Sequence, residues 1–146
     1  MELQNQLYDS KIRGVLSSLW LFYFVNHFFM SLHEFANPIF LERLLGGFDV
    51  SDSVMLMAAI MIEIPIAMIV LSRVLPNKIN WIVNIVVAIL TIGIEIMNNL
   101  NPDLDNMFFI TAELIGFVAI IVISLRWRSR LVKENRNEMV TQVYAS

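Results

Sequence analysis

The sequence predicts an all-α integral membrane protein, with four transmembrane helices in an antiparallel bundle and both termini in the cytoplasm. Three observations lead to this prediction. The 146 residues are 58% hydrophobic and only 16% charged, with a mean hydropathy of +0.68, whereas soluble domains are about 25% charged. The apolar residues gather in four long runs, and nearly all basic residues flank these runs on one side of the membrane.

Each of the four runs is near the ~20 residues that a helix needs to cross ~30 Å of hydrocarbon. Strands that span a membrane would instead show shorter segments of alternating hydrophobicity, which this sequence lacks. Lipid cannot satisfy free backbone groups, so we expect helices. The expected helices cover about 15–35, 54–75, 79–97 and 107–127, followed by a basic cytoplasmic tail at 128–146, in one domain over 1–146.

The segments between the runs contain helix-capping and turn-forming residues. The stretch "DVSDSV" offers several N-cap side chains before the second helix. "LPNK" contains Pro76, which ends the second helix and predicts an antiparallel hairpin with the third. "NNLNPDLDN" is typical of a turn before the fourth helix. In the one long loop, 39–45 is expected to form a short interfacial helix ending at Gly46 and Gly47.

The lysines and arginines predict the orientation. Every basic residue except Arg43 falls on the side of the two termini and of the loop between the second and third helices. Basic residues mark the cytoplasmic side, so we expect a multi-pass protein of the inner (cytoplasmic) membrane. The basic run after the fourth helix suits anionic lipids, although we favour a plain topology anchor. The residues of that run are Arg126, Arg128, Arg130 and Lys133.

The composition excludes several kinds of chemistry. Because the chain has no cysteine, disulfides, iron–sulfur clusters and thiol catalysis are excluded. Its two histidines occur without an HExxH or clustered-histidine pattern, which argues against a zinc site. We therefore expect no metal, no cofactor and no nucleic-acid partner.

A single acid, Glu63, interrupts the second apolar run two residues before Pro65. A charged acid at mid-membrane costs about 2.5–3.5 kcal/mol on insertion scales, so we expect Glu63 to face the bundle interior, paired or protonated. Pro65 also leaves the Met61 carbonyl without its helical donor. Two interpretations remain open: a neutral Glu63 that holds helices together, and an ion, proton or ligand site.

Polar residues recur at helical spacing on one face of each of the other helices. If these faces converge, they line an outward-opening acidic pocket that narrows towards Glu63. A histidine among carboxylates exchanges protons near neutral pH, so such a pocket suits a proton, a small cation or an amine ligand. The candidate binding residues are Tyr23, His27, His33, Glu34, Glu63, Asn84, Glu95 and Glu113.

The segments "HEFANPIFLERLLGG" and "IEIPIAMIVLSRVLPNKINWIVNI" resemble an uncharacterised family of small bacterial four-helix membrane proteins, a domain of unknown function similar in size and layout to DoxX-like proteins. The resemblance covers about 19–92 and implies the fold, but no activity. This chain has Ser31 and Asn80 where the family pattern has an aspartate and an arginine. The residues that the resemblance implies are family features are His33, Glu34, Glu63, Pro65, Ser72 and Asn84.

Three functions remain open. The first is a non-enzymatic protein that binds or conducts a proton, small cation or amine ligand through the pocket. Conduction would need a homo-oligomer, because four helices are too few for an inverted-repeat transporter. The alternative is a non-catalytic interaction or accessory subunit whose buried polar groups only pack. The third, with the least weight, is an enzyme acting on a lipid or isoprenoid, with an acid–base residue among His27, His33, Glu63 and Glu95.

Overall fold

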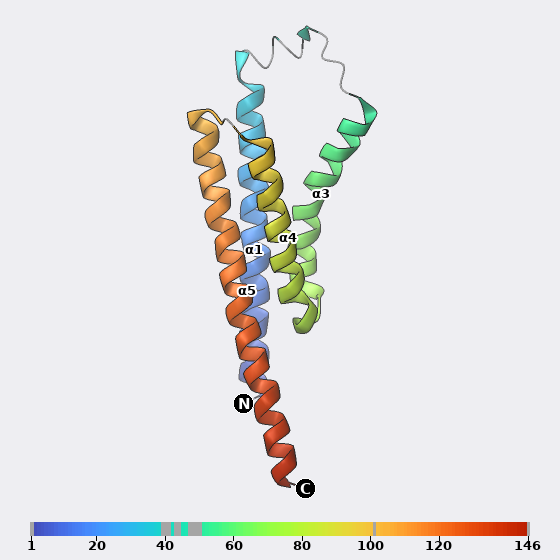
Figure 1. Cartoon of the computed structure of the whole chain (residues 1–146), viewed down its shortest axis with the longest axis vertical. Helices are drawn as coiled ribbons and strands as arrows, with labels where there is room; N and C mark the ends of the chain where they lie inside the picture. The colour runs from blue at the N-terminus through green and yellow to red at the C-terminus, as the bar shows by residue number, and fades with distance from the viewer. Residues whose placement is uncertain (1, 39–41, 43–44, 47–50, 101, 146) are drawn as a thin grey trace.

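A computed structural model describes residues 2–38, 42, 45–46, 51–100 and 102–145. In this part of the chain there are four helices and no strand, as the all-α prediction requires (Figure 1). The helices are α1 (Glu2–Phe35), α3 (Asp52–Val74), α4 (Asn77–Asn98) and α5 (Leu104–Ala145). The predicted short helix at 39–45 and the side chain of Arg43 lie largely outside the described residues.

The helix ends were predicted well for α3 and α4 and poorly for α1 and α5. Helix α3 continues through Pro65 and ends just before Pro76. Helix α1 begins at Glu2 rather than at 15, and α5 continues to Ala145 rather than ending at 127. Hydrophobicity marks the thickness of the membrane, whereas the polar flanks are rich in good helix formers that extend the helix beyond it. An ion pair one turn apart, Arg130 Nε to Glu134 Oε1 at 3.0 Å, stabilises that extension.

Within the described residues, three helices are long and apolar enough to cross a membrane: Leu3–Phe35, Asn77–Asn98 and Leu104–Asn137. Helix α3 is not among them; its side chains at 54, 57 and 58 lie outside the described set. Large apolar side chains are exposed along all four helices, such as Phe29, Ile60, Leu90 and Ile115. A helix surface that is apolar on its outer face as well as its inner face is typical of lipid contact.

Helix α1 is central to the packing, because it contacts both α3 and α5 extensively, while α4 packs on α5. Helices α3 and α4 share few contacts, and the N-terminal part of α3 diverges from the other helices (Figure 1). The buried apolar core includes Leu16, Trp20, Met68, Phe117 and Trp127. The predicted α3–α4 hairpin is present, but each of its helices packs mainly against a different neighbour.

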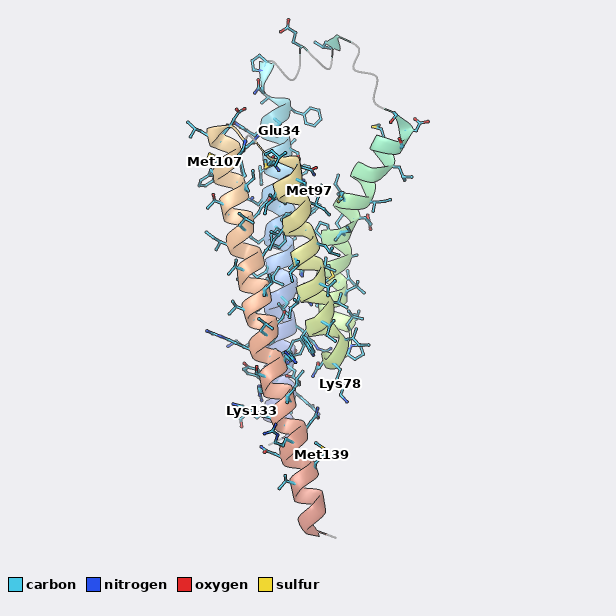
Figure 2. All side chains as sticks on the ribbon, in the orientation of Figure 1. Glu34, Lys78, Met97, Met107, Lys133 and Met139 are labelled. Carbon is cyan, nitrogen blue, oxygen red and sulfur yellow. The ribbon has the colours of Figure 1, made fainter. Side chains whose placement is uncertain are left out.

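Several basic residues lie towards one end of the long axis of the molecule. Lys78 and Lys133 lie towards the end that holds the α3–α4 turn, and Glu34 lies towards the other end (Figure 2). Arg13 of α1 contacts the start of α4, and Arg130 of α5 contacts Asn5, so these basic residues share the same end. We call it the basic end.

Candidate functional site

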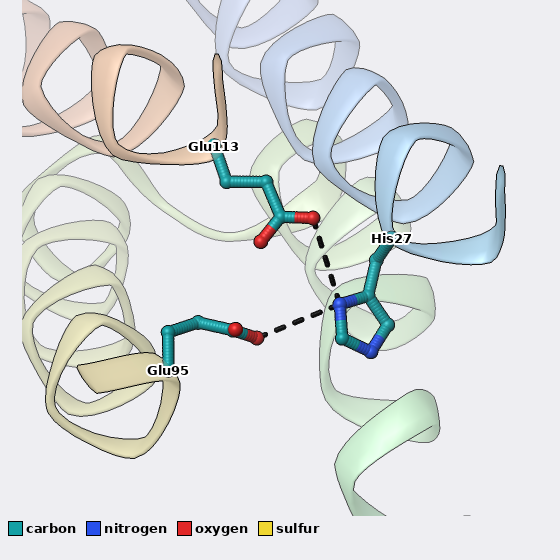
Figure 3. A group of neighbouring side chains, drawn as sticks. All are labelled: His27, Glu95 and Glu113. Carbon is teal, nitrogen blue, oxygen red and sulfur yellow. Dashed lines mark ion pairs between the residues drawn. The ribbon is translucent and has the colours of Figure 1, made fainter. Parts of the chain in front are cut away.

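Three chemically active side chains from three helices meet in the half of the molecule away from the basic end. His27 of α1 lies beside Glu95 of α4 and Glu113 of α5 (Figure 3). The His27 Nδ1 atom is 3.5 Å from Glu95 Oε1 and 3.5 Å from Glu113 Oε1. One ligand-type atom from each residue lies within 4.8 Å of the other two. We call these three residues the acid–histidine cluster.

The two carboxylates of the cluster are buried, His27 is partly exposed, and the cluster is incompletely hydrogen-bonded. Glu95 and Glu113 are 4% and 1% exposed. Two buried atoms, His27 Nδ1 and Glu113 Oε2, have no hydrogen-bond partner among the described residues. Most buried polar atoms in proteins are satisfied, and exceptions call for a reason such as an absent ion or water. The cluster therefore has hydrogen-bonding capacity that the described residues do not use.

Neighbouring side chains fix the orientation of both carboxylates. The Tyr23 hydroxyl donates to Glu95 Oε1 at 3.0 Å, and Asn99 Nδ2 donates to Glu95 Oε2 at 3.3 Å. Asn26 Nδ2 donates to Glu113 Oε1 at 3.1 Å and to the Phe109 carbonyl at 3.1 Å. Hydrogen bonds of this kind hold ligand oxygens in position around a bound ion.

A cavity of about 60 Å³ lies against the cluster. Tyr23, His27 and Glu95 line it, and Met61 and Ile64 of α3 close it on the opposite side. Pockets for drug-sized organic ligands measure roughly 300–1,000 Å³, whereas one buried water needs only about 10–15 Å³. The cavity therefore has the size for an ion with a few waters and is too small for an isoprenoid or a lipid.

His33 and Glu34 are not part of the cluster, although the sequence analysis grouped them with it. His33 Nε2 lies 2.7 Å from Asp105 Oδ2, and both side chains are about half exposed. Asn106 Nδ2 donates to Glu34 Oε1 at 3.1 Å. These two pairs join the end of α1 to the start of α5, one to two turns beyond His27.

Asn84 belongs to a different group of buried residues, nearer the basic end. Its Oδ1 accepts from Trp20 Nε1 at 2.7 Å and from Ser72 Oγ at 3.1 Å. Its Nδ2 donates to Asn80 Oδ1 at 2.7 Å, while Asn80 Nδ2 donates to the Ser72 carbonyl at 2.7 Å. We call Trp20, Ser72, Asn80 and Asn84 the asparagine network. It joins α1, α3 and α4 with its donors and acceptors paired.

Glu63 does not face the interior, so that expectation is wrong. Its side chain is exposed, whereas Pro65 and Met68 of the same helix are buried. Because successive helical residues are rotated by about 100°, the inward orientation of Pro65 and Met68 turns Glu63 outward. The predicted pocket that narrows towards Glu63 is therefore replaced by a smaller site without it.

Sequence reasoning missed several residues of the site. Asn26 and Asn99 donate to the carboxylates, but nothing in the sequence of α4 distinguishes Asn99 from other asparagines near helix ends. The argument against a metal site relied on short motifs, whereas His27, Glu95 and Glu113 come from three separate helices. Asn26 gave one usable signal, because it directly precedes His27 and lies one turn from Tyr23.

The fold and the cluster define a class: a helical protein that has, in its described part, three helices long and apolar enough to cross a membrane, with two buried carboxylates beside a partly exposed imidazole. Within that class, the chain belongs to a family of unknown function, DUF6326, whose model matches residues 4–133. The matched range includes the whole acid–histidine cluster and the asparagine network. No curated protein and no solved structure is significantly similar to the chain.

Proposed function

We propose that this protein is a multi-pass membrane protein that binds a small cation, above all a divalent first-row metal ion, at the acid–histidine cluster. The observation that carries the proposal is the convergence of His27, Glu95 and Glu113, with two of their buried atoms lacking hydrogen-bond partners among the described residues. A polar group that served only to hold helices together would be expected to have its hydrogen bonds complete.

The spacing of the ligand atoms supports a metal ion. In a tetrahedral site with bonds of about 2.1 Å, ligand atoms lie about 3.4 Å apart. Both distances from His27 Nδ1 to a glutamate oxygen are 3.5 Å. A mixture of imidazole and carboxylate suits ions such as Mn²⁺, Fe²⁺ or Zn²⁺, and the cavity leaves space for water as a further ligand.

The charge balance also supports a cation. Two ionised carboxylates in apolar surroundings would carry an excess of negative charge, and uncompensated buried charge is costly. A divalent ion would neutralise both carboxylates. A proton is the second cation that the geometry supports, because His27 Nδ1 is equally distant from the two carboxylates and can share a proton with either one.

The finer parts of the topology are also proposals. We infer that α3 is a fourth span, because it runs antiparallel to both α1 and α4, returns the chain to the end where α4 begins, and has the length to cross the membrane (Figure 1). The concentration of lysine and arginine at the basic end supports cytoplasmic termini and an inner-membrane location. The exposed Glu63 supports a homo-oligomer, since a second copy covering α3 would remove it from lipid. A bacterial family with DoxX-like layout remains a prediction.

Metal titration of the purified protein in detergent tests the proposal. We expect Mn²⁺ or Zn²⁺ to raise the melting temperature of the wild-type chain, because a ligand at a hundredfold excess over its Kd adds about 2.7 kcal/mol of stability. Glu95→Gln and Glu113→Gln should abolish this shift. Glu63→Gln is the matched control, since it makes the same chemical change at an exposed position, and it should retain the shift.

An absent shift in the wild-type chain, or an equal shift in all four proteins, would refute the metal site. Proteoliposomes then separate binding from conduction. Flux of the same ion or of protons that Glu113→Gln removes and Glu63→Gln retains would extend the proposal from binding to conduction.

A further inference from the structure

A second polar site lies at the basic end, in a groove between α1 and the α3–α4 turn. The groove has a volume of about 530 Å³ and is lined by Ser10, Arg13 and Gly14 of α1, Arg73 of α3 and Asn77 of α4. We propose that this groove binds the phosphate headgroup of an anionic phospholipid. The cation site lies elsewhere in the molecule, so this proposal does not depend on it.

The two arginines are held in place before any ligand binds. Arg13 Nε donates to Asn77 Oδ1 at 3.1 Å, and Arg13 Nη1 donates to the Arg73 carbonyl at 3.1 Å. Arg73 Nε donates to Ser17 Oγ at 2.9 Å. The two terminal nitrogens of Arg73 have no partner within the described part of the chain, and its side chain is exposed. A fixed guanidinium with free terminal donors is suited to phosphate.

The net charge of the groove favours an anion. Asp9 is the only acid that lines it, and both of its oxygens are already engaged. Its Oδ1 accepts from Trp127 Nε1 at 2.8 Å, and its Oδ2 accepts from Asn77 Nδ2. Asp9 therefore fixes Asn77, which in turn fixes Arg13. Two arginines against one engaged carboxylate leave the groove positive.

The position of the groove identifies the anion as a lipid headgroup rather than a free phosphate. Arg73 and Asn77, which line the groove, lie at the end of α3 and the start of α4, on either side of the α3–α4 turn (Figure 1 shows the turn). On α3, Val70 and Val74 beside Arg73 are more than half exposed, so acyl chains can lie against them. Other arginines at this end are partly engaged with aromatic rings: Arg128 lies 5.1 Å from the Trp81 ring centre, and Arg130 lies 3.7 Å from that of Tyr8.

Two variants test the groove in different ways. Arg73→Gln removes one charge and should weaken binding about fivefold, as expected for one basic residue at a membrane surface. Gly14→Leu places an uncharged side chain in the groove and leaves its net charge unchanged. The protein has space for this side chain, because a Cβ at Gly14 meets no atom within 4 Å. Leucine also favours helix over glycine, so this variant should fold.

Each variant has a matched control. Gly93→Leu adds the same side chain on α4, where a Cβ also meets no atom within 4 Å. The double variant Lys11→Gln, Arg126→Gln removes charge at the same end, but from a groove between α1 and α5. Native mass spectrometry of the full chain in detergent then counts retained phosphatidylglycerol against phosphatidylcholine.

We expect the wild-type chain and both controls to retain phosphatidylglycerol preferentially, and Arg73→Gln and Gly14→Leu to lose that preference. Equal retention by all variants, or an equal loss in the Lys11 and Arg126 double variant, would overturn the proposal. A last experiment compares inorganic phosphate with the lipid as a ligand of the purified chain. If it raised the melting temperature as much as the lipid does, and did so only with an intact groove, the ligand would be a free phosphate and the lipid assignment would be wrong.

Discussion

The asparagine network and the acid–histidine cluster both contain buried polar residues and both draw on α1 and α4, yet they differ in how well their hydrogen bonds are satisfied. In the network, the side-chain amides of Asn80 and Asn84 both donate and accept at 2.7–3.1 Å. In the cluster, His27 Nδ1 and Glu113 Oε2 lack partners in the described residues. The network is also uncharged, whereas the cluster contains three ionisable groups.

Under the proposed function, this difference separates polar residues that stabilise the protein from those that bind the cation. Satisfied amides and hydroxyls between helices contribute modest packing energy, on average about 0.6 kcal/mol per contact. Ionisable groups within a membrane are costly and tend to have a functional role. The two regions should therefore respond oppositely to substitution: loss of a network residue should destabilise the fold, and loss of a cluster charge should not.

The largest effect is expected for Asn84→Ala, which removes the acceptor of Trp20 Nε1 and of Ser72 Oγ. Leaving these buried donors unpaired, together with the lost contact to Asn80, should lower the free energy of unfolding by about 2 kcal/mol. Unfolding of the purified chain by a denaturing detergent measures this loss. Asn135→Ala, at an exposed position on α5, is the control and should be close to neutral. A neutral Asn84→Ala would show that the network is not structural.

The second largest effect, that of Glu113→Gln, is expected to raise the free energy of unfolding instead of lowering it. Glu113→Gln keeps the shape of the side chain and removes one of two buried negative charges that lie near each other. In the presence of a chelator, we expect the free energy of unfolding to rise by about 1 kcal/mol, as is common when a functional site is neutralised. The same denaturation at neutral pH measures it. A loss as large as that of Asn84→Ala would indicate that Glu113 is a structural residue and would remove the contrast between the two regions.

Helical periodicity placed Tyr23 and His27 on one face of α1, and the structure brings this face next to Glu95 and Glu113. Periodicity does not, however, limit how far apart residues on one face lie along the helix axis, so the predicted group of binding residues was too long. Asn84 shares the α4 face of Glu95, but eleven residues at 1.5 Å each separate them by about 16 Å. Because of that separation, Asn84 and Glu95 cannot line the same small cavity, so the division into two regions could have been predicted from the sequence.

Other features could not be obtained from the sequence. The rotation of α3 depends on how Pro65 and Met68 pack against neighbouring helices, and this packing turns Glu63 outward despite the cost estimated for an acid in lipid. The ends of α1 and α5 depend on helix propensity beyond the membrane, where hydrophobicity gives no signal. The membrane class and the number of helices were predictable because bilayer thickness sets the length of each apolar run.

The smallest effect is expected at Glu63, which lies outside both regions. Its side chain is exposed and has no hydrogen bond or ion pair within the described residues, so Glu63→Gln should change the free energy of unfolding by less than about 0.5 kcal/mol in detergent. The same denaturation series provides the measurement, with Asn84→Ala and Glu113→Gln as references on either side of zero. A clear loss of stability would mean that Glu63 contacts a second copy of the chain even in detergent. In that case a third polar region, shared between subunits, would have to be added to the two within one chain.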